Sequence, residues 1–254
     1  MKYSLIFSAL ACAASAANPL IAGVGSSYAA GPGVKKTIGV NLKAMLEAHF
    51  PGTTYDFDSL AVIGSHLVNV TKFQAPKLKG LSPDLIFFLS GGNDLNYVSC
   101  LQDATQSVCT QPEAQSTWQK DFEDALNAIF SNVANPTKVI LYIATYPVAL
   151  GPATNCGPNN PACRIATSEE VDNVEKLYND QVDFTVAALN NWRSIASNSA
   201  FKTRLIAMRA NSQGHEVGSQ SPWVYGANAS SAPWHPNDAG TASIAGYIYS
   251  NFTG

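Results

Sequence analysis

The stretch Leu85-Ile86-Phe87-Phe88-Leu89, followed directly by Ser90-Gly91-Gly92-Asn93-Asp94, decides the fold. A strand that is apolar at every position must be covered on both faces, which is typical of a parallel sheet between two layers of helices. Further apolar runs occupy residues 20–24, 139–144 and 204–208, with a less regular one at 55–63. Together they predict an α/β fold, a three-layer α/β/α sandwich with a central parallel sheet of about five strands.

Stretches with helical spacing separate these runs. Residues 110–113 (TQPE) and 167–170 (TSEE) both fit the capping box that begins many helices. Behind each start, apolar side chains recur at helical spacing and are expected in the core. They are Trp118, Phe122, Leu126, Ile129 and Val133 in the first helix, and Val171, Val174, Tyr178, Val182 and Leu189 in the second. A last helix is expected over residues 236–252.

The N-terminus has the pattern of a secretory signal peptide. Lys2 precedes an apolar run over residues 5–14, and Ala14-Ser15-Ala16 supplies a small-residue cleavage site. The run is too short to cross a bilayer, and a buried N-terminal helix is the less favoured alternative. With no repeat, linker or low-complexity tract beyond it, we expect a signal peptide at 1–16, a single domain over 17–254, and an extracellular protein.

Cysteine usage agrees with export. Outside the signal peptide, the short separations favour the disulfides Cys100–Cys109 and Cys156–Cys163 among three possible pairings. A zinc site is disfavoured, because there is no Cys-x-x-Cys pair and no histidine beside the cysteines. Sequons at Asn69, Asn228 and Asn251 predict N-glycosylation if the host is eukaryotic.

Composition limits the classes of partner. Of the 254 residues, 46% are hydrophobic and 13% charged, which predicts a large core and argues against disorder. The net charge is −3 and Lys and Arg form no cluster. Nucleic acid is therefore not an expected partner, since phosphate binding requires concentrated positive charge.

Three short motifs carry the candidate chemistry. Ser27 lies in a glycine-bordered turn after the first apolar run, where a strand-to-helix turn can expose a nucleophile. Asn93 follows the Leu85–Leu89 strand, and its amide can donate to an oxyanion. His235 precedes a predicted helix, and a neutral imidazole suits general-base work. Each motif alone also fits a structural role, namely an ordinary turn, a Gly-Gly-Asn-Asp loop or a surface histidine.

Taken together, the motifs resemble the SGNH or GDSL-type hydrolase family over nearly the whole mature chain. GSSYAAGPG, GGNDL and HPNDAG look like a secreted microbial, fungal, branch of that family. The resemblance implies a flavodoxin-like SGNH fold with Ser27 as nucleophile and His235 as its base. It also implies an oxyanion hole formed by the backbone N–H groups of Ser27 and Gly64 and by the Asn93 amide. The Gly64 match is the weakest, because it rests on one glycine.

Two positions depart from the family pattern. Ser26 replaces the usual aspartate of the first block, which we expect to be tolerated. Ala232 stands where the triad acid belongs, so another group must hold the His235 tautomer. We expect the Ala232 backbone carbonyl to do so. Asp238, placed to cap the last helix, is a less favoured substitute, and a degenerate, inactive enzyme is the third alternative.

The resemblance implies a secreted serine esterase that acts on carboxylic esters by two-step acyl transfer, without metal or organic cofactor. A classical α/β-hydrolase is disfavoured, because the Gly-x-Ser-x-Gly elbow is absent. Short- to medium-chain acyl or acetyl esters, small or on a polysaccharide, are the expected substrates of a monomer without a membrane segment. The alternative is an inactive SGNH scaffold that serves as a secreted carbohydrate- or lipid-binding protein.

Overall fold

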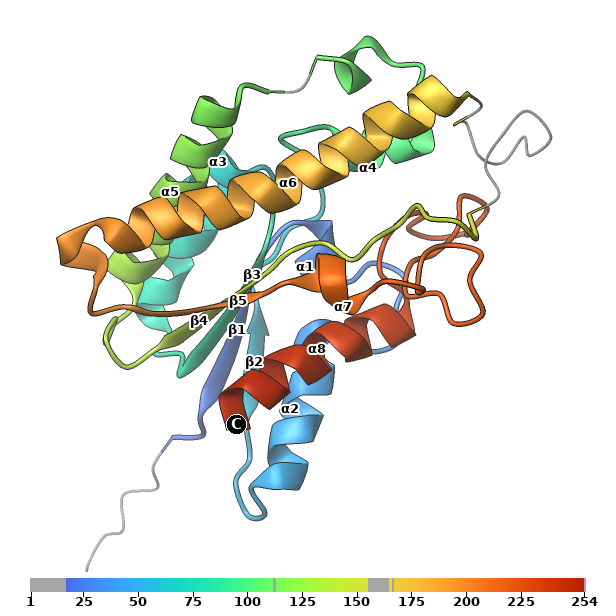
Figure 1. Cartoon of the computed structure of the whole chain (residues 1–254). Coiled ribbons are helices and arrows are strands. Elements are labelled where there is room, and N and C mark those ends of the chain that lie inside the picture. Colours follow the sequence, from blue (N-terminus) through green and yellow to red (C-terminus); the bar gives the residue numbers. More distant parts are fainter. Residues whose placement is uncertain (1–16, 112, 155–164, 166, 254) are drawn as a thin grey trace, which may run out of the picture.

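In the computed structural model, the described residues are 17–111, 113–154, 165 and 167–253. A parallel sheet with the strand order β2-β1-β3-β4-β5 forms the centre (Figure 1). Its strands are β1 Leu20–Gly25, β2 Asp56–Ser59, β3 Leu85–Leu89, β4 Ile140–Ala144 and β5 Lys202–Ile206. The order is the doubly wound, flavodoxin-like one, and the predicted α/β/α sandwich of five strands is confirmed. The predicted signal peptide, residues 1–16, lies outside the described residues.

Helices cover both faces of the sheet (Figure 1). One layer contains α2 Ile38–His49 and α8 Asp238–Thr253, which pack against each other. The opposite layer contains α5 Gln115–Asn132 and α6 Ser168–Ser194, together with the continuous segment α3 Leu67–Asn69, η1 Val70–Gln74 and η2 Ala75–Gly80. Short helices complete the chain: α1 Ser27–Ala30, α4 Tyr97–Gln102, η3 Ser107–Cys109, η4 Ala196–Asn198 and α7 Met208–Asn211.

Strand β3 is buried at all five positions, as its apolar sequence predicts. Strand β5 begins two residues earlier than residues 204–208 suggested, because it is an edge strand with two exposed side chains, at Lys202 and Arg204. After Ile206 the chain turns into α7, where the Met208 N–H donates to the Thr145 hydroxyl at 2.9 Å. An edge strand needs only one apolar face, so its pattern is shorter and weaker than that of β3.

The two predicted helix starts have different outcomes. At α6, the Thr167 hydroxyl accepts from the Glu170 N–H and the Glu170 carboxylate accepts from the Thr167 N–H, which confirms the capping box. The prediction of a helix start at residues 110–113 is wrong, because α5 begins at Gln115 without a side-chain cap. Thr110 instead follows η3, and its hydroxyl donates to the Ser107 carbonyl at 3.0 Å. The disulfide at Cys109 ends that turn.

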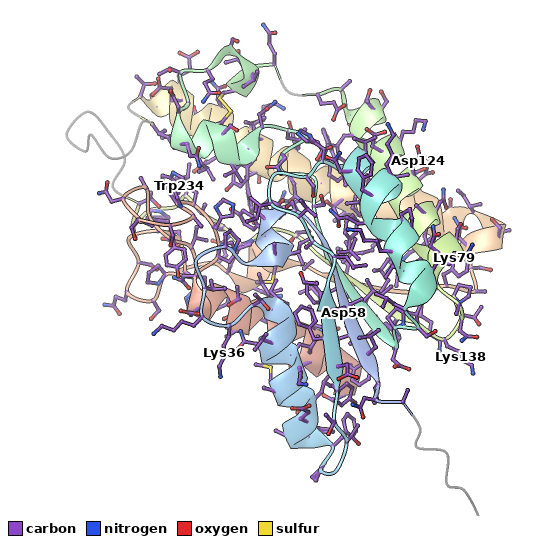
Figure 2. The ribbon with its side chains drawn as sticks, turned by 180° about the vertical axis from the view of Figure 1, so that it is seen from behind. Lys36, Asp58, Lys79, Asp124, Lys138 and Trp234 are labelled. Atoms are coloured by element: carbon purple, nitrogen blue, oxygen red, sulfur yellow. A yellow bond between two sulfur atoms is a disulfide. The ribbon has the colours of Figure 1, made fainter. Side chains whose placement is uncertain are left out.

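The predicted disulfide Cys100–Cys109 is present, and it joins α4 to η3. The other predicted pair, Cys156–Cys163, lies outside the described residues. Charged side chains such as Lys79, Asp124 and Lys138 lie on the outside of the molecule (Figure 2). Within the described part of the chain, every helix is too short or too polar to span a membrane.

Candidate active site

The candidate residues meet at the carboxyl end of the sheet. Ser27 follows β1, Gly64 lies in the loop after β2, and Asn93 follows β3. These three strands are neighbours, and β1 and β3 form the point where the strand order reverses. Open α/β sheets place their ligand sites at this point. His235 reaches the same end from the loop that precedes α8.

The Ser27 hydroxyl lies 2.8 Å from Nε2 of His235, although 208 residues separate them in the chain. Both side chains are largely covered, with 3% of Ser27 and 8% of His235 exposed. Gly25 makes the sharp turn that brings Ser27 to this place. Its φ is +135°, and a Cβ there would lie 1.9 Å from the Leu89 carbonyl oxygen, so only glycine fits.

The loop that carries His235 is fixed by backbone contacts. Tyr225 exchanges hydrogen bonds with it, as donor to the His235 carbonyl at 2.8 Å and as acceptor from the Trp234 N–H at 3.0 Å. The Trp234 side chain is buried. Ala232 and Trp234 have φ values of 50° and 64°, in the left-handed region that L-residues seldom adopt. Each costs of order 1–3 kcal/mol, and such residues cluster at functional sites.

Nδ1 of His235 donates to the Pro233 carbonyl at 2.8 Å. This corrects the expectation that the Ala232 carbonyl is the main partner of the ring: that carbonyl accepts from the His235 backbone N–H at 3.2 Å and affects the pKa of the ring less than the Pro233 carbonyl does. The left-handed turn at Ala232 presents the next carbonyl to the imidazole. A carbonyl can only accept, so the proton lies on Nδ1 and the Nε2 lone pair faces the Ser27 hydroxyl.

Asp238 does not serve the histidine. Its carboxylate accepts from the backbone N–H groups of Lys35 and Lys36, at 2.7 and 3.3 Å, and so joins α8 to the loop before α2. Asn237 caps α8 in its place, because its side chain accepts from the Gly240 N–H at 2.9 Å. Among the described residues, no carboxylate forms an ion pair with His235.

Burial lowers the pKa of His235 below its ordinary 6.5, and the carbonyls of Pro233 and Ala232 oppose that shift. The surrounding tyrosines add no charge, since burial raises the pKa of Tyr28 well above its usual value and that of Tyr146 to about 12. The imidazole is therefore neutral at pH 7 and free to accept a proton.

Two tyrosines that the sequence did not indicate support the pair. The rings of Tyr28 and Tyr146 stack 3.9 Å apart, and Tyr28 lies 5.2 Å from the His235 ring. The Tyr28 hydroxyl donates to the Trp234 carbonyl at 2.5 Å, which connects the serine turn to the histidine loop. Ser26 pairs with the Tyr146 hydroxyl at 2.9 Å, so the serine in place of the family aspartate is buried and satisfied. Only the adjacency of Tyr28 to Ser27 could have suggested this role.

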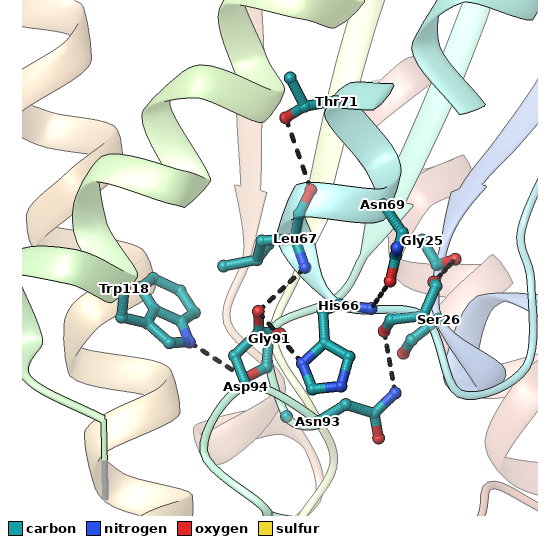
Figure 3. A network of polar contacts seen from close by, with 12 residues as sticks. Gly25, Ser26, His66, Leu67, Asn69, Thr71, Gly91, Asn93, Asp94 and Trp118 are labelled. Atoms are coloured by element: carbon teal, nitrogen blue, oxygen red, sulfur yellow. Dashed lines mark hydrogen bonds and ion pairs between the residues drawn. The ribbon is translucent and has the colours of Figure 1, made fainter. Parts of the chain in front are cut away.

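The loop after β3 that carries Asn93 is hydrogen-bonded to the loop after β2 that carries Gly64 (Figure 3). Asn93 Nδ2 donates to the Ser65 carbonyl at 2.9 Å, and the Ser65 hydroxyl donates to the Gly25 carbonyl at 2.9 Å. Gly64 is exposed with φ +77° and open space beside it. The backbone N–H groups of Ser27 and Gly64 donate to no other residue in the part of the chain that is described. Both are thus available to a ligand.

Asp94 and Gln74 stabilise the segments around these loops through hydrogen bonds, and the sequence did not single them out. The Asp94 carboxylate accepts from the Leu67 N–H at 3.0 Å and lies 3.6 Å from Nδ1 of His66 (Figure 3). Burial raises the pKa of Asp94, while its hydrogen bond from Leu67 and the nearby His66 oppose the shift. Gln74 bonds both the N–H and the carbonyl of Gly25. Spacing along the chain gives no sign of these long-range contacts.

No group of three or more His, Cys, Asp or Glu side chains suited to a metal ion occurs among the described residues. No protein-family model matches the chain. No curated protein matches it either.

Solved structures are nevertheless similar over most of the chain. An extracellular lipase from Streptomyces rimosus is 15% identical, with a TM-score of 0.64, and the match covers 91% of this chain and 99% of the lipase. The acetyl xylan esterase AlAXEase is 11% identical, with a TM-score of 0.57 and coverage of 91% and 98%. An acetylxylan esterase from Geobacillus stearothermophilus is 11% identical, with a TM-score of 0.55 and coverage of 91% and 92%. The fold is that of these lipases and esterases.

Proposed function

We propose that this protein is a serine esterase of the SGNH or GDSL type, with Ser27 as nucleophile and His235 as base. The 2.8 Å contact between the Ser27 hydroxyl and Nε2 of His235 carries the proposal. Three observations support it: the lowered pKa of His235, the N–H groups of Ser27 and Gly64 that donate to no described residue, and a fold shared with ester hydrolases. From the leader pattern of residues 1–16 we further infer that the protein is exported, and we expect it to act as a monomer.

The reaction has two steps. His235 removes the Ser27 proton as Ser27 attacks the ester carbonyl, and the oxyanion is bound by the N–H groups of Ser27 and Gly64 and by the second Nδ2 hydrogen of Asn93. The protonated His235 gives its proton to the departing alcohol. Water, deprotonated by His235, then attacks the acyl-enzyme and releases the acid.

The Pro233 carbonyl takes the orienting role that a carboxylate fills in a Ser-His-Asp triad. It holds the required tautomer and ring orientation, but its partial charge stabilises the imidazolium less than a full negative charge would. The pair is therefore a Ser–His dyad held by the main chain. The fixed, strained loop around Pro233 supplies the precision that the missing carboxylate would otherwise add.

The pH dependence of kcat/KM should reflect the lowered pKa of His235. Because the reaction requires neutral imidazole and burial lowers the pKa of His235, kcat/KM should fall with decreasing pH along a limb whose midpoint lies below 6.5. Ala232→Asp should raise the midpoint, since a nearby carboxylate favours the charged ring and aspartate tolerates positive φ. kcat/KM is measured from pH 4 to 8 in both proteins. A wild-type midpoint above 6.5 would contradict the assignment.

Asn93→Ala should reduce kcat for p-nitrophenyl acetate by roughly 10²–10³-fold, the usual cost of one oxyanion donor. Asn93 also holds the Ser65 carbonyl, so Asn69→Ala is the control. It removes another hydrogen bond of the segment that contains Ser65, from the His66 N–H to the Asn69 side chain at 2.8 Å, and keeps the Asn93 donor. A similar loss in both variants would show that loop order, and not donation by Asn93, is responsible.

The second candidate function is a binding protein on an inactive scaffold. Among the described residues, no carboxylate forms an ion pair with His235, and this favours the binding protein. An active-site organophosphonate separates the two functions, because it requires an activated serine. Stoichiometric labelling of Ser27, located by mass spectrometry and absent in His235→Ala, supports the esterase. A folded protein that stays unlabelled supports the binding scaffold.

A further inference from the structure

A hollow of about 250 Å³ opens beside the Gly64 turn. Its walls are apolar side chains that the rest of the fold leaves uncovered: Ile63 is 65% exposed, Phe73 61% and Val62 48%. Large apolar side chains in one exposed group mark binding sites more often than scattered ones do. We call the hollow bounded by Val62, Ile63, Gly64 and Phe73 the Gly64 groove.

The floor of the groove is polar by residue type but offers little to a polar ligand. The Ser65 hydroxyl donates to the Gly25 carbonyl and accepts from Gln74 Nε2 at 3.1 Å. The Gln74 Oε1 atom accepts from the Gly25 N–H at 2.8 Å. These two side chains are buried and already paired, and the third polar residue of the lining, Asn69, is half-buried with its side-chain oxygen bonded to the His66 N–H at 2.8 Å. The interior therefore suits an apolar chain better than a sugar, whose hydroxyls would find few partners.

The groove adjoins the atoms proposed to bind the oxyanion. Gly64 belongs to its lining, and Ser65, the next residue, receives the Asn93 amide through its carbonyl. Because Ile63 and Phe73 line the same hollow as Gly64, an ester carbonyl bound by the Gly64 N–H would place its acyl substituent beside these two side chains. The alcohol portion can then leave toward His235, the proton donor.

We propose that the Gly64 groove binds the acyl chain of the substrate and makes the enzyme selective for medium-length, straight-chain acyl esters. The inference rests on the proposed esterase function and specifies its substrate. At about 30 Å³ per water-sized group, a 250 Å³ hollow holds roughly eight such groups. The preference should therefore rise from acetate and level off near octanoate.

The test compares kcat/KM for p-nitrophenyl acetate, butyrate, hexanoate and octanoate, each below its aggregation limit. In the wild type, kcat/KM should increase up to about fourfold per added methylene, the value of about 0.8 kcal/mol for burying one. The double variant Ile63→Ser/Phe73→Ser should lower the octanoate-to-acetate ratio by about tenfold or more. Ile195→Ser, an exposed isoleucine at the end of α6 (44% exposed), should leave the ratio unchanged.

Two outcomes overturn the proposal. If kcat/KM of the wild type is the same from acetate to octanoate, the groove does not bind the acyl chain, although the protein is an esterase. A double variant that keeps the wild-type ratio on dissolved esters, and loses activity only on emulsified ones, assigns the patch to a lipid interface instead. If no ester is hydrolysed, binding of octanoate is followed by NMR of the wild type and the double variant. If the wild type binds octanoate and the double variant does not, the groove is an acyl-binding site but the protein is not an esterase. If the wild type does not bind octanoate, both proposals are wrong.

Discussion

Ser27→Ala should lower ester hydrolysis by roughly 10⁶-fold, because the serine and its base act as one unit and the loss of either removes the acyl-enzyme route. We expect the variant to fold like the wild type. Ser27 lies in a four-residue helix, its hydroxyl bonds only His235 among the described residues, and alanine retains helix propensity. kcat should be measured with p-nitrophenyl butyrate, beside Tm from thermal unfolding.

Ser26→Ala is the matched control for that variant. The two serines are adjacent and buried, but the Ser26 hydroxyl faces Tyr146 and the Ser27 hydroxyl faces His235. Ser26→Ala should reduce the free energy of unfolding by about 1 kcal/mol, the usual net worth of a hydrogen bond, and retain most of kcat. If Ser27→Ala kept activity within tenfold of the wild type, the nucleophile would have to be another residue.

His235→Ala should lower kcat by roughly 10⁴–10⁶-fold. Without the imidazole, no neighbouring group accepts the Ser27 proton, since Tyr28 and Tyr146 keep their protons far above neutral pH and no carboxylate pairs with His235 in the described chain. Added imidazole should restore part of the rate, because the variant leaves an imidazole-sized space next to Ser27. kcat should be measured with imidazole from 0 to about 100 mM, a range that covers weak, millimolar binding.

The control is His49→Gln. His49 ends α2 and pairs with the Tyr249 hydroxyl at 3.0 Å, away from the strand ends that carry Ser27. That variant should keep wild-type kcat and show no response to imidazole. Equal losses at both histidines, or imidazole rescue of neither, would argue against a base at position 235.

The sheet could be predicted because β3 and β4 are apolar over their whole length, a pattern that only a doubly covered strand needs. The edge strands were less clear: β2 is mostly exposed, and β5 alternates. The helix start at Thr110 was wrong because Thr110 instead ends the disulfide-bonded turn η3. The Cys100–Cys109 pairing was itself predicted from its short separation, but its consequence for the neighbouring Thr110 was not.

At the site, the motifs located Ser27, Asn93 and His235 at one end of the sheet. The carbonyl next to the ring was predicted one residue too early, because an L-alanine in left-handed conformation is improbable from sequence. Tyr146, Gln74 and Asp94 escaped notice for another reason. Their contacts join residues 27 to 120 positions apart, and hydrogen bonds of that range leave no spacing signal.

The group that orients His235 is an oxygen of the main chain at Pro233. No codon change can delete such an atom, whereas a triad aspartate is lost by a single base substitution. Substitutions at positions 232 and 233 are therefore limited by the need to keep the loop conformation, and no acidic side chain is required there. Homologues that share this arrangement would escape any search that demands a carboxylate before the histidine, and the backbone conformation would identify them instead.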